Sequence, residues 1–248
     1  MMSLLLWAAA VLCGAVANAA AERTVYVAAP LFNGREAAFN ASLARELEAR
    51  GVRTRLPQRD GFEFAALAGA LAKRLPAKEV RPALETVIYA LDMGRLLPQS
   101  DAVVANVDEP IDEGVVVEMV HARGLGMPVL CVRTDVRSPY GELGEEMGGL
   151  HAFVGLQCTR LFRRDLGGST PEAAAARLKD LAAALAEAAA EPAPKRPEPG
   201  ERSRDLEAAA KLLFDGVVDL HSPAGLDEIA ARYEANRKTL DRLRPSFK

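Results

Sequence analysis

The sequence predicts a doubly wound α/β fold, in which helices cover both faces of a parallel sheet. Short apolar segments rich in β-branched residues alternate along the chain with longer segments that have helical periodicity. Half of the residues are hydrophobic, which is enough for one sizeable core. Parallel strands joined through helices need right-handed crossovers, so we expect a sheet of the flavodoxin or Rossmann type.

Each element follows from its own residue pattern. Strands are expected where β-branched and apolar residues cluster, at 24–32, 52–56, 101–108, 128–135 and 151–162. Helices are expected where apolar residues recur every three or four positions, at 34–50, 81–97, 114–126 and 170–190. Gly51 closes the first helix, Pro82 is placed in the first turn of the second, and Thr170 and Pro171 begin the last as N-cap and N1.

The chain divides into four parts. Residues 1–20 contain no charged side chain and end in the small-x-small pattern ANA, which predicts a cleaved signal peptide rather than a membrane anchor. Residues 21–190 form the α/β domain, 191–204 a Pro-rich linker, and 205–248 a small helical extension that docks on the main domain or on a partner. The protein is therefore expected to be periplasmic or secreted; a misassigned start codon, which would make it cytoplasmic, is the alternative.

Composition excludes several classes of function. The formal net charge of −3 leaves no basic surplus for a nucleic acid. Glu118 and His121 form an E-x-x-H pair, but a di-metal carboxylate bundle needs a second copy and three histidines supply none, so no metal is expected. No Gly-rich phosphate loop and no G-x-S-x-G are present, and no cofactor is expected. Cys131 is expected as a small buried hydrophobe rather than a disulfide partner.

The segment 108–118 carries five carboxylates where the core should begin. Asp108 ends a strand, at the edge of the sheet where α/β proteins bind ligands. Asp112 and Glu113 are placed to cap the next helix, and Glu109 and Glu113 are expected in solvent. Glu118 lies one turn inside that helix among apolar neighbours, which favours a functional role, although the solvent-facing side of the helix remains an alternative.

Four motifs occur in one register: VYVAAPLF at 25–32, LPQRDG at 56–61, SDAVVANVD at 100–108, and Asp112-x-Gly114-x-x-x-Glu118 before A-x-G-x-G-x-P-V-L. Together, over residues 24–162, they resemble the nucleoside 2-deoxyribosyltransferases. The resemblance implies that Glu118 is the nucleophile that attacks the anomeric carbon of a 2'-deoxynucleoside and forms a covalent deoxyribosyl-enzyme. The positive, oxocarbenium-like transition state of such a reaction is stabilised by a carboxylate.

The resemblance also implies the other site residues. Asp112 helps to protonate the departing base, Asp92 contacts the base, and Tyr26 orients the nucleophile. Further substrate-binding positions are Gln58, Arg59, Asp60, Asp108, Gly114 and His151. The implied partners are a small deoxynucleoside and a free nucleobase, and relatives build their sites across subunits, so a homo-oligomer is expected.

The chain departs from the family pattern in ways that keep other functions open. Val115 stands where a small or hydroxylated residue is usual, and Val120-His121 replaces a pair such as Gly-Tyr. The segment 148–155 lacks the Asn that relatives donate to the sugar of a neighbouring subunit, and His151 is its substitute. An N-glycoside hydrolase of nucleosides or nucleotides is therefore the first alternative, and a non-catalytic nucleoside-binding or interaction module the second.

Overall fold

The computed structural model describes residues 23–166, 170–217 and 219–244. The predicted signal peptide, residues 1–20, lies outside the described residues. Among the residues described, no helix combines the length and hydropathy that crossing a membrane requires.

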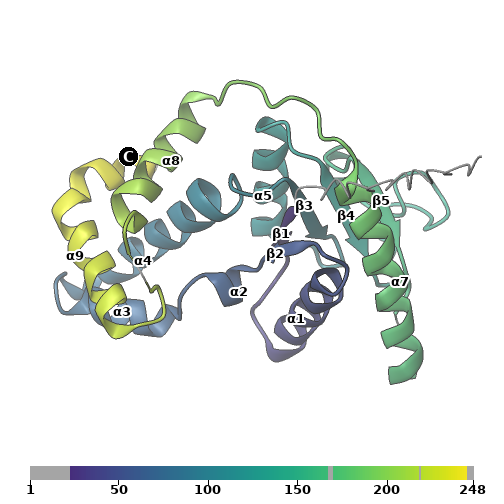
Figure 1. The fold of residues 1–248 in the computed structure, drawn as a ribbon, viewed down its shortest axis with the longest axis horizontal. Helices are drawn as coiled ribbons and strands as arrows, with labels where there is room; N and C mark the ends of the chain where they lie inside the picture. The colour runs from purple at the N-terminus through teal and green to yellow at the C-terminus, as the bar shows by residue number, and fades with distance from the viewer. Residues whose placement is uncertain (1–22, 167–169, 218, 245–248) are drawn as a thin grey trace, which may run out of the picture.

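A parallel sheet of five strands, in the order β2-β1-β3-β4-β5, forms the centre of the described structure (Figure 1). Its strands are β1 (Thr24–Ala28), β2 (Arg53–Arg55), β3 (Ala102–Asn106), β4 (Val129–Arg133) and β5 (Arg160–Arg163). Tyr26 of β1 is in register with Arg55 on one side and Val103 on the other. The predicted α/β fold with a parallel sheet is confirmed.

Helices cover both faces of this sheet. One face packs against α1 (Gly34–Glu48) and α7 (Pro171–Ala190), where Leu43 and Leu181 meet Val25 and Leu130. The other face packs against α4 (Ala77–Leu91) and α5 (Glu113–Gly124), where Val87 and Met119 meet Tyr26 and Val103. The strand order reverses direction between β1 and β3, which makes their carboxyl ends the expected position of a ligand site.

The segment between β2 and β3 is more helical than the sequence predicts. It contains the short α2 (Pro57–Asp60), then α3 (Phe64–Ala72), then α4, which ends in the π-helical turn η1 (Asp92–Leu96). The prediction that Pro82 lies in the first turn of its helix is wrong. Helix α4 starts at Ala77, after Pro76, so Pro82 lies inside it. Residues 77–81 are good helix formers, and an interior proline costs that helix one backbone hydrogen bond.

Cys131 is buried, as predicted, but the prediction that it is not a disulfide partner is wrong, because it forms a disulfide with Cys158. The parallel pairing of β4 with β5 aligns Cys131 with Leu161, which brings the loop before β5 alongside β4. The short helix α6 (Ala152–Gly155) precedes Cys158 in that loop. The two cysteines are distant in sequence, and only the strand pairing makes them neighbours.

The C-terminal helices share the core of the α/β domain. Helices α8 (Glu201–Phe214) and α9 (Pro223–Leu240), followed by the 3-10 turn η2 (Asp241–Leu243), pack against α3, α4 and η1. Leu206, Leu213 and Ile229 are fully buried in the same apolar cluster as Tyr26 and Met119. Helix α8 begins at Glu201, inside the predicted linker. Of the two expected dockings, on the main domain or on a partner, the structure has the first.

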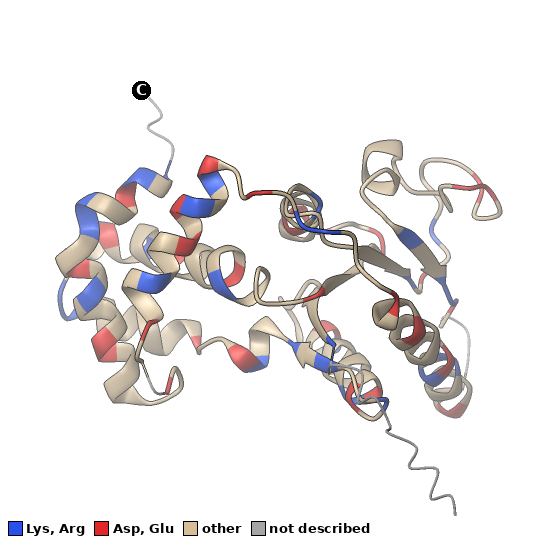
Figure 2. Ribbon diagram, turned by 45° about the horizontal axis from the view of Figure 1, so that its top comes forward, with Lys and Arg blue, Asp and Glu red and all other residues tan. Residues whose placement is uncertain are grey.

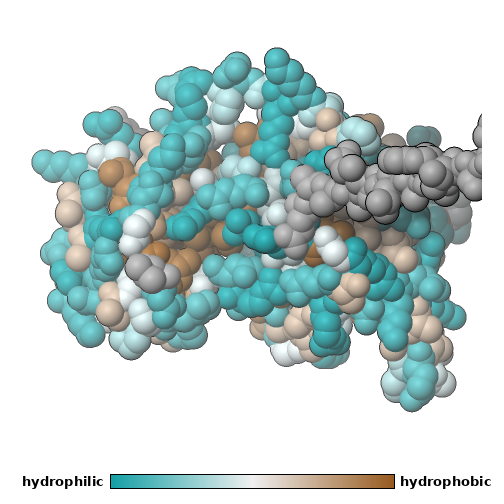
Figure 3. Space-filling model, in the orientation of Figure 1, coloured by the Kyte–Doolittle hydropathy of each residue, from teal (hydrophilic) through white to brown (hydrophobic). Residues whose placement is uncertain are grey.

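The surface of these helices is hydrophilic. Lys, Arg, Asp and Glu are mixed along α8 and α9 (Figure 2). Figure 3 shows hydrophilic residues over most of one face, with hydrophobic residues visible in the hollow of its left half, where α3, α4, α8 and α9 lie. Ion pairs hold α9 to its neighbours at the rim: Arg74 of the loop after α3 pairs with Asp227 at 3.0 Å, and Arg237 pairs with Glu79 of α4 at 2.6 Å.

Candidate active site

A cavity of about 710 Å³ opens at the carboxyl ends of β1 and β3. That volume lies within the range of small-molecule sites. Phe32, Asn33 and Glu36 line one wall, beside the start of α1. Asn33 caps α1 by accepting from Arg35 N and Glu36 N, and the Glu36 carboxylate accepts from Phe32 N in return. This reciprocal capping fixes the loop that follows β1.

Asp112 lines the opposite wall and begins α5. Its Oδ1 accepts from Val115 N at 3.0 Å, which is the predicted N-cap. Gly114 leaves room for this cap, because a Cβ there would lie 2.8 Å from Asp112 Oδ1. Only one oxygen of Asp112 is engaged in the cap, so the other remains available to a ligand.

Glu118 points from α5 toward the sheet and meets Tyr26 of β1. The hydroxyl of Tyr26 donates to Glu118 Oε1 at 2.5 Å. Tyr26 is fully buried, which, with the nearby Glu118 charge, raises the pKa of the phenol well above its usual value. The phenol therefore stays protonated and acts as the donor.

Burial raises the pKa of two neighbouring carboxyls, those of Glu118 and Asp92. The pKa of Glu118 rises to about 8, first because of burial and then because of the charges of Asp92 and Asp112, while the Tyr26 hydrogen bond lowers it. Burial alone raises the pKa of Asp92, in η1, to about 7. Two neighbouring carboxyls with raised pKa values are typical of a site for proton transfer.

Comparison with known proteins now decides the family. The sequence model of the family described as nucleoside 2-deoxyribosyltransferase matches residues 25–157, more than half of the chain. The chain belongs to the nucleoside 2-deoxyribosyltransferase family. The matched segment carries Tyr26, Asp92, Asp112 and Glu118, and it ends before α7, α8 and α9.

Other comparisons add little to this assignment. A search of curated proteins found no match. Among solved structures, the sugar isomerase domain of an RpiR transcription factor from Sphaerobacter thermophilus aligns over 77% of this chain and 76% of its own, at 16% identity and a TM-score of 0.34. At that TM-score the likeness carries no argument about the site.

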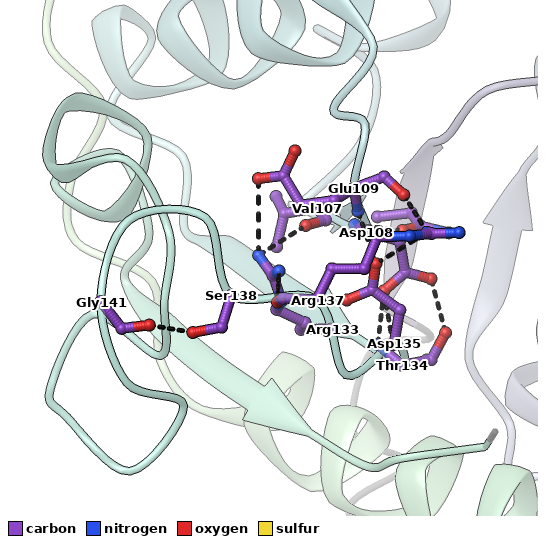
Figure 4. Close-up of polar contacts among 10 residues, drawn as sticks. Val107, Asp108, Glu109, Arg133, Thr134, Asp135, Arg137, Ser138 and Gly141 are labelled. Atoms are coloured by element: carbon purple, nitrogen blue, oxygen red, sulfur yellow. Dashed lines mark hydrogen bonds and ion pairs between the residues drawn. The ribbon is translucent and has the colours of Figure 1, made fainter. Parts of the chain in front are cut away.

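In this family member a polar network holds the loop between β3 and α5 to the end of β4 (Figure 4). The carboxylate of Asp108 accepts from Thr134 N and Thr134 Oγ1, each at 2.5 Å, and from Asp135 N at 3.1 Å. Asp108, a predicted substrate-binding residue, lies in the lining of the cavity, but both of its oxygens are engaged by the protein. Its carboxylate joins the ends of β3 and β4.

A buried arginine completes the network. Arg133 is 1% exposed and pairs with Asp135 at 3.2 Å and with Glu109 at 3.8 Å. The expectation that Glu109 lies in solvent is wrong, because its side chain turns inward to this guanidinium. Arg137, at the rim of the cavity, donates to the Glu109 carbonyl oxygen and pairs with Asp135.

Of the predicted site residues, only Asp108 and Asp112 line the cavity, and Tyr26, Asp92, Gly114 and Glu118 lie outside its lining. Four further predicted residues also lie outside the lining and contact other parts of the chain. Gln58 donates to Ala37 O and accepts from Asn40, which ties α2 to α1. Arg59 pairs with Glu48 and Asp60, and Asp60 also accepts from Leu56 N. His151 is exposed and caps α6, where its ring contacts Tyr140 and Phe153 edge to face.

Sequence reasoning missed two residues that organise the site. His121 is half-buried, and its Nε2 lies 3.1 Å from Met93 O. A carbonyl only accepts, so this nitrogen carries the proton and links α5 to η1. The signal for Arg133 was its place at the end of an apolar strand.

Among the described residues, no group of three or more metal-binding side chains could hold an ion.

Proposed function

We propose that this protein transfers 2-deoxyribose between nucleobases, with Glu118 as the nucleophile. The observation that carries the proposal is the 2.5 Å hydrogen bond from Tyr26 to Glu118, which fixes one carboxyl oxygen. We assign the attack on the substrate to the other oxygen. Membership of the nucleoside 2-deoxyribosyltransferase family supports the reaction class. The nearby cavity at the ends of β1 and β3 supports a small-molecule substrate.

The reaction would proceed in two displacements. The free oxygen of Glu118 forms a bond to C1' of the deoxynucleoside while the N-glycosidic bond breaks, and the base leaves with the electron pair and takes up a proton. A nitrogen of the second base then attacks C1' and gives its proton to the carboxylate that protonated the first base, the bond to Glu118 breaks, and the Glu118 carboxylate is restored. Tyr26 holds the carboxylate in the attacking orientation throughout.

The raised pKa values of Glu118 and Asp92 determine how much of the protein is in the protonation state that reacts. Glu118 must be ionised to attack, and the hydrogen bond from Tyr26 favours that form. The leaving base needs a proton, and Asp92, whose pKa is raised to about 7, holds one in part of the molecules at neutral pH. Asp112 is the second candidate donor, through the oxygen that its helix cap leaves available.

We also propose that the protein forms a homo-oligomer. Support comes from apolar side chains that are exposed on α5 and in or beside α6, namely Val117, Val120, Phe153 and Leu156. A second copy packed against these side chains would remove them from water. Light scattering after size-exclusion chromatography tests this, and a monomer at micromolar concentration would contradict it.

We further propose that the protein is exported. The disulfide between Cys131 and Cys158 supports an oxidising compartment, where such bonds form and persist. Fractionation of the source cells tests the location, and recovery of the protein in the cytoplasm with both thiols reduced would contradict it.

A base-exchange assay tests the proposed activity. Purified protein is incubated with deoxyinosine and adenine, and the products are separated by chromatography. Wild type should release hypoxanthine and form deoxyadenosine, and Glu118→Ala should lose at least about 1,000-fold in rate. Hypoxanthine without deoxyadenosine would indicate hydrolysis instead of transfer. Binding of the nucleoside without either product would indicate a non-catalytic module.

A further inference from the structure

The π-helical turn η1 carries Asp92 near Glu118. Neighbouring elements hold this turn on several sides. Leu97 N donates to Asp92 O at 2.9 Å, five residues back, which is the bond that defines a π-turn. Such turns are rare and occur mostly where function needs a residue displaced from the regular helix. The three residues after Asp92 contact two other helices, α5 and α8.

Helix α8 makes two of those contacts. The backbone of Gly94 lies so close to α8 that a Cβ there would be 2.3 Å from Leu206 O and 2.8 Å from Leu206 C. The Arg95 guanidinium donates to Phe214 O at 3.1 Å and lies over the Phe214 ring at 5.8 Å. The third contact runs from Met93 O to His121 of α5. The turn that carries Asp92 is thus clamped between the nucleophile's helix and the C-terminal extension.

The packing of α8 makes this clamp rigid. Its inner face, formed by Leu206, Ala209, Ala210, Leu213 and Phe214, is at most 4% exposed. Helix α9 packs against α8 and also against α3 and α4, so α8 is braced by an element that is itself fixed to the main domain. Closely packed interiors transmit small displacements rather than absorb them.

We propose that α8 is part of the active site, because its contact with Gly94 positions Asp92 for catalysis. Helix α8 lies outside the segment that matches the family, so this is a role for the extension of this chain. Asp92 remains the catalytic residue, and Gly94 and Arg95 act as positioning residues. The inference rests on the proposed function in giving Asp92 a part in glycosyl transfer.

The test compares two glycine substitutions. In Gly94→Ala the new methyl group meets a backbone carbonyl, which no side-chain rotation can relieve, so η1 or α8 must move. The matched control is Gly69→Ala in α3, an exposed helical glycine whose added Cβ meets nothing within 4 Å. A displacement of about 1 Å costs on the order of 100-fold in rate when geometry controls the chemistry.

Two measurements separate a positioning role from a merely structural one. The first is the base-exchange rate, divided into kcat and KM. The second is the pKa of the Asp92 carboxyl, measured by ¹³C NMR and assigned with Asp92→Asn. Gly94→Ala should lower kcat by about 100-fold with little change in KM. It should also move the Asp92 pKa down, because a displaced η1 admits water. Gly69→Ala should change neither.

Every outcome bears on the proposal. A Gly94→Ala protein that melts at a lower temperature but keeps its kcat and its Asp92 pKa would overturn it. If wild type shows no base exchange, the proposed function fails, and the NMR comparison alone then decides whether α8 positions Asp92. If Gly94→Ala does not fold, Arg95→Gln replaces it, because that change removes the bond to Phe214 O without adding bulk. An unchanged Asp92 pKa in Arg95→Gln would then overturn the proposal.

Discussion

The hydroxyl of Tyr26 lies 2.5 Å from Oε1 of Glu118, although the two residues are 92 positions apart. One belongs to a central strand and the other to the helix after the next strand along the sheet. The contact therefore exists only when the sheet and α5 are packed correctly, and it ties the orientation of the proposed nucleophile to the rigid core. The first predictions concern this pair.

Replacing Tyr26 with Phe should move the pH dependence of activity upward. The hydrogen bond from Tyr26 lowers the pKa of Glu118, so its loss raises that pKa above the present value of about 8. The acidic limb of kcat/KM, which follows ionisation of Glu118 in the free enzyme, should shift to higher pH. The rate at the optimum should fall by about 10- to 100-fold. A profile identical to that of wild type would mean that Tyr26 does not act on the nucleophile.

Asp92→Asn should shift the same limb in the opposite direction. The negative charge of Asp92 raises the pKa of Glu118, so removing it lets Glu118 ionise at lower pH. The acidic limb of kcat/KM should then lie below about pH 8, whereas the maximum rate should fall because a proton donor is lost. The measurement is the kcat/KM profile from pH 5 to 10. A shift to higher pH would contradict the electrostatic coupling of the two carboxyls.

Glu118 should also destabilise the fold at alkaline pH. The pKa of Glu118 is raised from 4.5 to about 8 on folding, so between these values the native state binds more protons than the unfolded chain, and stability falls as pH rises. Glu118→Gln removes this penalty. It should increase the free energy of unfolding by on the order of 1–3 kcal/mol at pH 9 and by little at pH 4. Urea unfolding at both values measures it, and equal effects at the two pH values would contradict the burial of a charged carboxylate.

Much of the fold could be predicted from the sequence because strands and helices of an α/β protein have distinct periodicities. The first four strands, α1, α5 and α7 follow directly from those patterns. The fifth strand was expected at 151–162, but α6 occupies Ala152–Gly155 and β5 only Arg160–Arg163. Helix α3 was missed because its Ala- and Leu-rich segment has no polar face. The interior position of Pro82 was missed because a proline is usually expected at the start of a helix. The position of α3 depends on packing against α9, which no local pattern contains.

The site was predicted only in part, for a similar reason. Asp112 was identified from its position before a helix, and the pairing of Tyr26 with Glu118 only through the family resemblance. The disulfide, the inward turn of Glu109 and the contact of His121 with Met93 each join segments that are distant in sequence. Strand register and helix packing decide such contacts, and they cannot be read from the residue pattern of a single segment.

The buried ion pairs of Arg133 should be important for stability. Its guanidinium faces Glu109 and Asp135, so Arg133→Met would leave the partly buried Glu109 carboxylate without its ion-pair partner and Asp135 with Arg137 alone as a cationic partner. The expected loss is about 3–5 kcal/mol in the free energy of unfolding. The matched control is Arg81→Met, which removes an exposed pair with Glu85 and should cost less than about 0.5 kcal/mol. Similar losses for the two variants in urea unfolding would contradict the role given to the network.

The central claim is that Glu118 carries the sugar, and mass spectrometry of the trapped enzyme tests it most directly. Wild type is mixed with a deoxynucleoside in the absence of an acceptor base, quenched in acid within milliseconds and digested. We expect a peptide containing Glu118 to gain the mass of one 2-deoxyribosyl group, and the same peptide from Glu118→Ala to remain unmodified. Base release by wild type with no modified peptide, or with the sugar attached to another residue, would contradict the account.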